Sequence, residues 1–329
     1  MPFYWRRKRQ TAERGKWVFL SPRPRCRAMM GLGSRLLVMT TLVGLLPALT
    51  GCGFLRQVKT DELVMARQAS LRGEQALRLG HWTHAERLYH QALQHSSNDH
   101  RAHRGYAEAL WNRDARDTAI AHMEKAVRFS GEDPKVVVRL GEMYLANGDL
   151  TRAEYCAAQA ISTDHALPTA WALKGNILFR AGKLDRALAS FHRALSLQDR
   201  FPSVQLELTR IYRMQQRPRR ALATLDVLSR GYESQATPQE VLFLHGLVLK
   251  DLGRYDDSVD RLTQAAQQGE PSARLLYELS ESQWRAGSPD NARLSLLEAL
   301  SLTPDHHPSR QLLARIESDR QGLTASMPR

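Results

Sequence analysis

The sequence predicts an all-α solenoid of about seven helix-turn-helix hairpins with a capping helix at its C-terminal end. Three observations support this prediction: small residues recur every 34 positions, bulky apolar residues recur between them, and glycines recur where each hairpin would turn. The first column of small residues contains Ala85, Ala119, Ala153, Ala187 and Ala221 and then, after three extra residues, Ser258 and Ala292. A stack of hairpins is expected because one hairpin cannot bury its apolar face alone.

Each further column has a mechanical role in such a hairpin. Small residues let two helices approach closely, and bulky residues fill the groove between them. A second small column contains Gly73, Ala107, Gly141, Gly175, Thr209, Gly246 and Ser280, and the bulky column contains Tyr89, Met123, Phe191, Leu225, Leu262 and Leu296. Glycines 80, 148, 182, 253 and 287 are predicted to end the first helix in the left-handed conformation, and Asp114 and Gln216 replace them in two repeats.

The period also sets the predicted boundaries. The repeats begin near residues 66, 100, 134, 168, 202, 239 and 273 and together occupy 66–305. Pro134, Pro168 and Pro202 are expected to begin first helices, where the missing amide donor costs nothing. Residues 306–320 are predicted to form a helix that caps the last hairpin, and 321–329 a disordered tail.

This pattern resembles the tetratricopeptide repeat, and the clearest unit runs from Pro168 to Phe201. The resemblance implies a right-handed superhelix whose concave face binds an extended peptide or a partner helix. The repeats use nearly all of the chain after residue 65, and the sequence has neither a glycine-rich phosphate loop nor a Gly-x-Ser-x-Gly elbow. We therefore expect a non-enzymatic scaffold or assembly adaptor that has no cofactor.

Helical spacing places positions 2, 5, 9, 12 and 13 of each first helix on one side, which is the expected binding groove. The groove residues predicted in this way are Arg104, Trp111, Asn176, Phe179, Arg180, Arg210, Arg213, Phe243, Tyr277, Trp284 and Arg285. Aromatic residues and arginine are enriched in binding hot spots. The alternative is that the aromatic residues pack between repeats and the arginines are merely solvated.

An uncharged segment, Leu36–Leu55, precedes the repeats. Its residues Leu49, Thr50, Gly51 and Cys52 resemble the lipobox of bacterial lipoproteins, which implies that the chain is cut before Cys52 and that this cysteine is lipidated. Residues 29–51 would then be a signal peptide, and 52–65 an anchor and linker. Alternatively, residues 36–55 form an uncleaved transmembrane anchor in the inner membrane. Either reading places the repeats in the cell envelope facing the periplasm, and Gly53 after the cysteine favours the outer membrane.

Charge is concentrated at the N-terminal end. The formal net charge is +13, but residues 1–51 hold ten Lys or Arg and one Glu, a net of +9, which leaves 13 − 9, or +4, for the rest. We therefore expect protein partners and no nucleic acid. The basic extension 1–28 precedes Met29 and Met30, so translation starts either at Met1 or at one of these two methionines.

Histidines gather in the first repeat and at the start of the second, at positions 81, 84, 90, 95, 100 and 103. His100 and His103 have a spacing used by helical metal sites, so a metal-dependent factor is a further alternative. No cysteine or carboxylate is arranged with these histidines, and we assign no metal ligands. Cys156 is the one cysteine after Cys52, and its small neighbours predict a core position.

Overall fold

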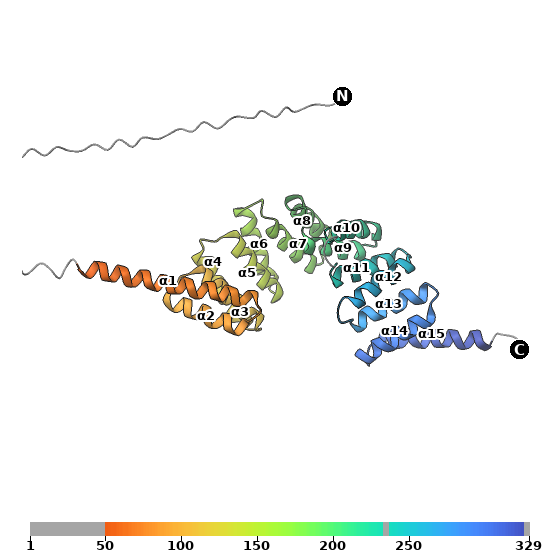
Figure 1. Cartoon of the computed structure of the whole chain (residues 1–329). Helices are drawn as coiled ribbons and strands as arrows, with labels where there is room; N and C mark the ends of the chain where they lie inside the picture. Colours follow the sequence, from red (N-terminus) through yellow and green to blue (C-terminus); the bar gives the residue numbers. More distant parts are fainter. Residues whose placement is uncertain (1–49, 233–236, 326–329) are drawn as a thin grey trace, which may run out of the picture. The chain divides into compact units, whose positions relative to one another are not determined.

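The computed structural model describes residues 50–232 and 237–325, and these ranges contain 15 α-helices and no strand (Figure 1). The chain divides into two compact units, Met1–Arg56 and Gln57–Arg329. The repeats and all the side-chain contacts described below lie in the second unit. The expectations for residues 1–49, including the signal peptide, lie outside the described residues.

Seven helical hairpins follow one another along the chain. Their first helices are α1 (Thr50–Arg78), α3 (His100–Asn112), α5 (Pro134–Ala146), α7 (Pro168–Arg180), α9 (Pro202–Met214), α11 (Gln239–Asp251) and α13 (Ala273–Arg285). Their second helices are α2 (Trp82–His95), α4 (Arg116–Phe129), α6 (Leu150–Thr163), α8 (Leu184–Leu197), α10 (Pro218–Arg230), α12 (Tyr255–Gln267) and α14 (Pro289–Leu302). Three first helices begin at the prolines that the sequence indicated.

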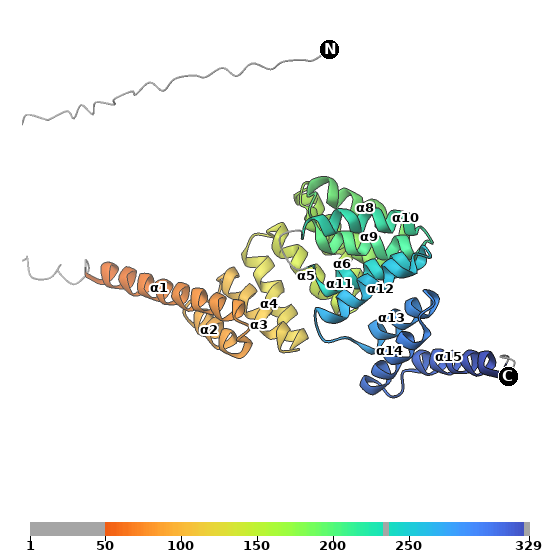
Figure 2. The same cartoon turned by 45° about the vertical axis from the view of Figure 1, so that its right-hand side comes forward.

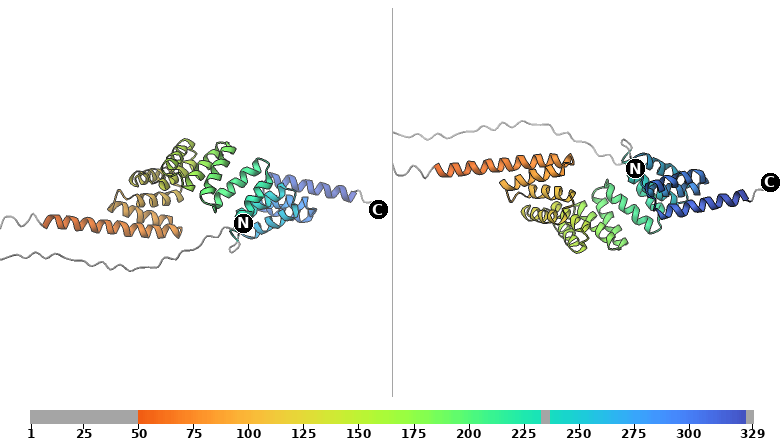
Figure 3. Two further views of the ribbon diagram at one scale, coloured as in Figure 1. Left: turned by 90° about the horizontal axis from the view of Figure 1, so that it is seen from above. Right: turned by 90° about the horizontal axis from the view of Figure 1, so that it is seen from below.

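Packing proceeds from neighbour to neighbour. From α2 to α15, each helix contacts the next, and first helices of adjacent repeats also meet, as in the pairs α5 with α7 and α11 with α13. The colours of Figure 3 show the repeats following one another in chain order. The buried apolar residues form several clusters distributed along the stack. Such contacts between successive repeats define an all-α solenoid, which confirms the predicted fold class.

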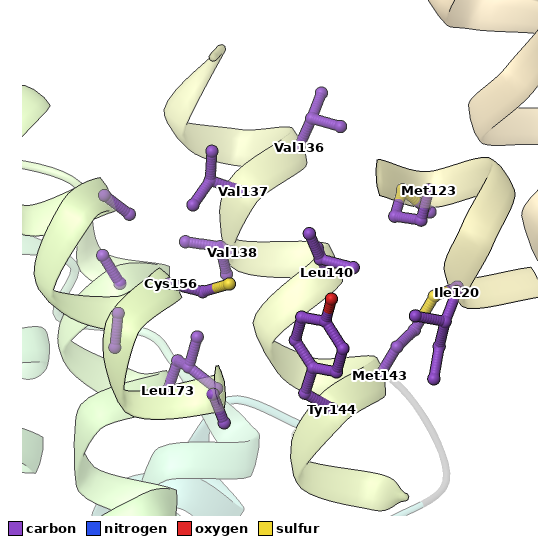
Figure 4. Close-up of a cluster of buried hydrophobic side chains, with 14 of the residues drawn as sticks. Ile120, Met123, Val136, Val137, Val138, Leu140, Met143, Tyr144, Cys156 and Leu173 are labelled. Carbon is purple, nitrogen blue, oxygen red and sulfur yellow. The ribbon is translucent and has the colours of Figure 1, made fainter. Parts of the chain in front are cut away.

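The small and bulky columns meet as predicted. Phe191 on α8 is fully buried, and its ring lies against Gly175 on α7, where an added Cβ would come within 2.5 Å of ring carbons Cδ1 and Cε1. The third repeat has Ala157 where the others carry a bulky residue, and Leu173 from the next repeat reaches into the space beside Gly141. Leu173 lies in the same core as Val138, as Figure 4 shows. The helices therefore pack closely throughout the stack.

Cys156 occupies a core position in this cluster, as the sequence predicted (Figure 4). Its side chain is 4% exposed. Burial raises the pKa of its thiol to about 11. The thiol is therefore protonated at neutral pH and acts as a small apolar packing group.

The turns between the two helices of each hairpin use the left-handed conformation. All five predicted turn glycines have positive φ, for example Gly182 at 71°. Asp114 and Gln216, which replace glycine, adopt the same conformation at φ 62° and 56°. These two residues have a Cβ and therefore hold the turn at some cost in free energy.

The ends of the solenoid differ in detail from the expected boundaries. Helix α15 (His307–Ala325) caps the last hairpin, and its Leu312 and Ile316 are buried against Leu296. It continues past residue 320, into the segment expected to be a disordered tail, because no proline occurs before Pro328 to stop it. At the other end, α1 begins at Thr50, so the segment 52–65, predicted to be an anchor and linker, is helical, and it too lacks proline.

Candidate protein-binding surface

The largest cavity described for this chain lies between the first helices of the first two repeats, α1 and α3, and its volume is about 700 Å³. These helices contribute positions 2, 5 and 9 of each repeat, which are the positions of the predicted groove. The residues at these positions are Arg67, Ser70 and Glu74 on α1 and Arg101, Arg104 and Glu108 on α3. Leu63, Leu71 and Leu77 add apolar surface. The predicted groove is thus hollowed at this end of the solenoid.

The floor of this cavity is formed by Tyr89 from α2. Its ring is 4% exposed and lies between Gly73 on α1 and Gly105 on α3. An added Cβ at Gly105 would come within 2.1 Å of the ring carbon Cζ, so only glycine admits the ring here. Burial and, next in size, the nearby Glu74 carboxylate raise the pKa of Tyr89 to about 12. The floor is therefore a neutral aromatic surface held by close packing.

Several hydrogen-bond donors in the cavity have no partner among the described side chains. The Oγ of Ser70 is buried and has no hydrogen-bond partner among the described residues. Arg67, Arg101 and Arg104 form no ion pair within the described ranges, whereas Glu108 is engaged by Arg139, whose Nε and Nη2 donate to it at 2.7 and 2.8 Å. The cavity therefore holds three arginines without ion pairs, together with the Glu74 and Asp99 carboxylates and apolar side chains. Its arginines suit a segment bearing carboxylates.

Further along the stack, three of the predicted groove arginines are paired within the chain. Arg213 on α9 donates to Asp251 on α11, with Nη2 3.2 Å from Oδ1, and Arg210 contacts Glu207 and Glu240. Arg285 contacts Glu281 at 3.2 Å. These three arginines are thus engaged by carboxylates of the chain itself, and their binding of a partner stays a prediction. Helical spacing within one repeat cannot show which acidic residue the neighbouring repeat supplies.

A similar network surrounds Lys250, at position 12 of the sixth repeat. Its Nζ donates to Glu281 at 2.7 Å and also to Glu278. Burial alone would lower the pKa of Lys250, but the hydrogen bonds that its ammonium donates to Glu278 and Glu281 outweigh that effect and raise it. These ion pairs link first helices of adjacent repeats and neutralise much of the charge on this part of the surface.

The predicted groove aromatics pack against neighbouring structure. Trp111, Phe179 and Phe243 are partly buried against the core clusters. At the C-terminal end, Tyr277 and Trp284 contact the cap: the ring of His306 lies 5.8 Å from that of Tyr277, and the Arg315 guanidinium lies 4.7 Å above the ring of Trp284. These contacts agree with the alternative reading of the sequence, in which the aromatic residues pack between repeats.

Asn176 and Arg180 complete the predicted set. Asn176 is half-buried on α7, and Arg180 is exposed at the C-terminal end of the same helix. Neither forms an ion pair or a side-chain hydrogen bond within the part of the chain that the structure describes. Of the predicted groove residues, only Arg104 lines the cavity between α1 and α3.

Sequence reasoning missed Arg67, Ser70 and Glu74. The repeat period could have identified them, because they occupy groove positions 2, 5 and 9 of the repeat that begins at residue 66. The predicted groove residues, however, begin at Arg104, in the second repeat.

In the described part of the chain, the histidines of the first two repeats meet as a pair, His103 with His122. His103 and His122 approach each other, with their Nδ1 atoms 3.0 Å apart, and His103 Nε2 lies 2.9 Å from the Ser97 carbonyl oxygen. Burial, followed by the charge of His103, lowers the pKa of His122 to about 4. Among the described side chains, no group of three or more His, Cys, Asp and Glu is arranged to hold a metal ion.

The proposed anchor lies mostly outside the described residues. Cys52 falls in the first turn of α1, and its side chain is not among those described. In the described part of the chain, no helix combines the length and the apolar character needed to cross a membrane. Most of the uncharged segment 36–55 precedes this part.

Stacked hairpins with a hollowed face define the class of α-solenoid interaction scaffolds. Family models of the tetratricopeptide repeat match residues 71–135, 168–201 and 243–307. The chain therefore contains tetratricopeptide repeats, and proteins built from them bind other proteins or peptides and are generally not enzymes. No curated protein sequence matches the chain.

Solved structures show the same architecture. A tetratricopeptide repeat protein from Parabacteroides merdae is 11% identical over 77% of this chain and 99% of its own, with a TM-score of 0.56. PilF of Pseudomonas aeruginosa is 16% identical over 78% of this chain and 99% of its own, with a TM-score of 0.49. YrrB, described as a TPR protein with an unusual peptide-binding site, is 20% identical over 58% of this chain and 96% of its own, with a TM-score of 0.49. The first of these likenesses supports the fold alone.

Proposed function

We propose that this protein is a non-enzymatic adaptor, lipid-anchored at the bacterial cell envelope, that binds a partner segment in the cavity between α1 and α3. The main support for the proposal is that residues at the groove positions of two successive repeats line this cavity. The partner is an extended peptide or a helix that carries carboxylates and at least one apolar side chain. Its carboxylates would pair with Arg67 and Arg104, and its apolar side chain would contact Leu71 and the ring of Tyr89.

This cavity brings together three arginines, Arg67, Arg101 and Arg104, that form no ion pair in the described ranges. Binding at Arg210 or Arg213 would first have to break an existing ion pair, which reduces the net gain from any new contact. Binding at Arg67 and Arg104 breaks no ion pair and also supplies an acceptor for the buried Ser70 hydroxyl. The partner's strongest contacts are therefore expected at the N-terminal end of the solenoid.

The test is capture of partners from intact cells by chemical crosslinking, followed by their identification. The double variant Arg67→Ala with Arg104→Ala should reduce the yield of the main partner at least tenfold, because it removes two charge-assisted hydrogen-bonding groups. The matched control, Arg87→Ala with Arg128→Ala, removes two exposed arginines from second helices and should leave the yield unchanged. Equal yields from the two double variants would reject the cavity as the binding site.

Anchoring through Cys52 is proposed from the lipobox-like sequence, and its alternative is a single membrane-spanning segment at residues 36–55 in the inner membrane. Two acyl chains or more would hold the solenoid stably at a membrane, since each buried methylene contributes about 0.8 kcal/mol. Labelling with radioactive palmitate separates the two readings. Label that disappears in Cys52→Ser supports the lipid anchor, and an unlabelled wild-type chain supports the spanning segment.

A further inference from the structure

Five exposed cations gather at two adjacent turns of the solenoid. Lys183 and Arg186 lie at the start of α8, and Arg217, Arg219 and Arg220 lie at the start of α10. We call these five residues the basic rim. The two turns adjoin, because Gln215 Nε2 donates to Asp185 Oδ1 at 3.0 Å, and α8 and α10 lie side by side (Figure 2).

The basic rim differs from the equivalent turns of other repeats. Arg116 pairs with Asp114 at 2.7 Å, Arg152 with Asp149 at 2.5 Å, and Arg254 with Asp257 at 2.7 Å. Each of these arginines is thus neutralised by a carboxylate within three residues. No side chain of the basic rim forms an ion pair within residues 61–232 and 237–320. The nearby Asp185 accepts its hydrogen bond from Gln215 instead.

The position of these cations disfavours a role in stabilising the fold. The N-terminus of a helix carries partial positive charge, so arginine there is unfavourable and an acidic residue would be favourable. Helix α10 has no acidic residue in its first turn and instead has Arg219 and Arg220 there, next to Arg217 at its N-cap. The sequence therefore places uncompensated positive charge where an external anion would neutralise it.

We propose that the basic rim docks the solenoid on a membrane surface rich in anionic lipid headgroups. The proposal rests on the proposed function for the presence of a nearby membrane. A planar array of headgroups suits these residues, because none of the five lines a described cavity and their long side chains are free to adjust. Met214, which is 60% exposed at the end of α9, adds an apolar side chain beside Arg217.

An acidic polypeptide is the competing occupant. Specific recognition of a carboxylate by arginine uses paired, directional hydrogen bonds, which require a fixed guanidinium in a shaped site. The cations of the basic rim are instead exposed and dispersed over two turns, and an arrangement of this kind attracts a charged surface without selecting one residue. The arrangement therefore favours the membrane.

The test is co-sedimentation of the full chain, carrying Cys52→Ser so that no acyl chain contributes, with vesicles that contain one third anionic lipid. Each basic residue near such a surface contributes about 1 kcal/mol, or about fivefold in partitioning. The triple variant of Arg217, Arg219 and Arg220 to Gln should therefore bind about 100-fold more weakly. The control triple variant of Arg72, Lys125 and Lys135 to Gln has the same net charge and should change binding by less than threefold.

The remaining outcomes also decide the matter. Equal losses in the two triple variants would mean that net charge alone governs binding, and would overturn the assignment to the basic rim. Binding of the same variants to soluble polyglutamate tests the competing occupant. If the rim variant loses polyglutamate binding but keeps vesicle binding, the basic rim binds an acidic polypeptide and the membrane proposal is overturned. Unfolding of the rim variant is tested by its melting temperature, which should be unchanged or higher because the substitutions relieve repulsion at the start of α10. Crosslinking yield at the α1 and α3 cavity reports on the proposed function separately.

Discussion

Close contact between Gly175 and Phe191 makes Gly175→Ala a sharp test of the packing. The added Cβ would lie 2.5 Å from two ring carbons, well inside van der Waals contact, and Phe191 is fully buried and cannot leave. Overpacking of a core costs about 1–3 kcal/mol, whereas replacing glycine by alanine within a helix contributes about 1 kcal/mol of stability. The variant should therefore be destabilised by up to about 2 kcal/mol despite its better helix propensity.

The second variant, Phe191→Leu, provides the control. Repeats five and seven pair a leucine in the bulky column with Thr209 or Ser280, so leucine tolerates a Cβ at the glycine position. The double variant, Gly175→Ala with Phe191→Leu, should lose about 1–2 kcal/mol less free energy of unfolding than the two single variants lose together. Urea unfolding of the four chains measures this coupling. A Gly175→Ala variant more stable than the wild type, or strictly additive effects, would refute the reasoning.

Three further predictions follow from the turns, the ion pairs and the histidines. Gln216→Gly should raise stability by about 1 kcal/mol, because φ at this turn is 56°, and a lower melting temperature would argue against strain there. Lys250→Met should cost about 2 kcal/mol by leaving Glu278 without its partner and Glu281 with Arg285 alone, whereas Arg254→Met at an exposed pair should change the free energy of unfolding by less than about 0.5 kcal/mol. Burial lowers the pKa of His122 to about 4, so as the pH falls from 6.5 to about 4 this histidine is protonated in the unfolded chain before it is in the folded one, and stability should fall. His122→Asn should therefore make the melting temperature depend less steeply on pH in this range. An unchanged pH dependence would contradict the prediction.

The fold could be predicted closely from the sequence, because the 34-residue period arises from the close packing of the helices. Gly175 and Phe191 must face each other wherever two helices approach closely, so their spacing alone places both helices. The turn at Gln216 could also be located, because the period requires left-handed backbone there whichever residue is present. The helix ends at Thr50 and Ala325 could not be predicted, since no packing constraint marks them.

The binding surface was less accessible to sequence reasoning. Helical spacing identified the correct face, but the ion pairs of Arg213 with Asp251 and of Arg139 with Glu108 join residues 38 and 31 positions apart. Such pairs depend on the rotation between adjacent repeats, which a one-dimensional pattern does not contain. The unpaired cations between α1 and α3 could be recognised only after these pairs had been found.

The most direct test of the adaptor role is site-specific photo-crosslinking in intact cells. A photoreactive amino acid at Ser70, inside the cavity between α1 and α3, should give one dominant covalent adduct with a second protein. The same amino acid at Tyr155, which is 71% exposed on α6, should give none above background. Absence of an adduct at Ser70, or adducts of equal yield at both positions, would contradict partner binding in the cavity.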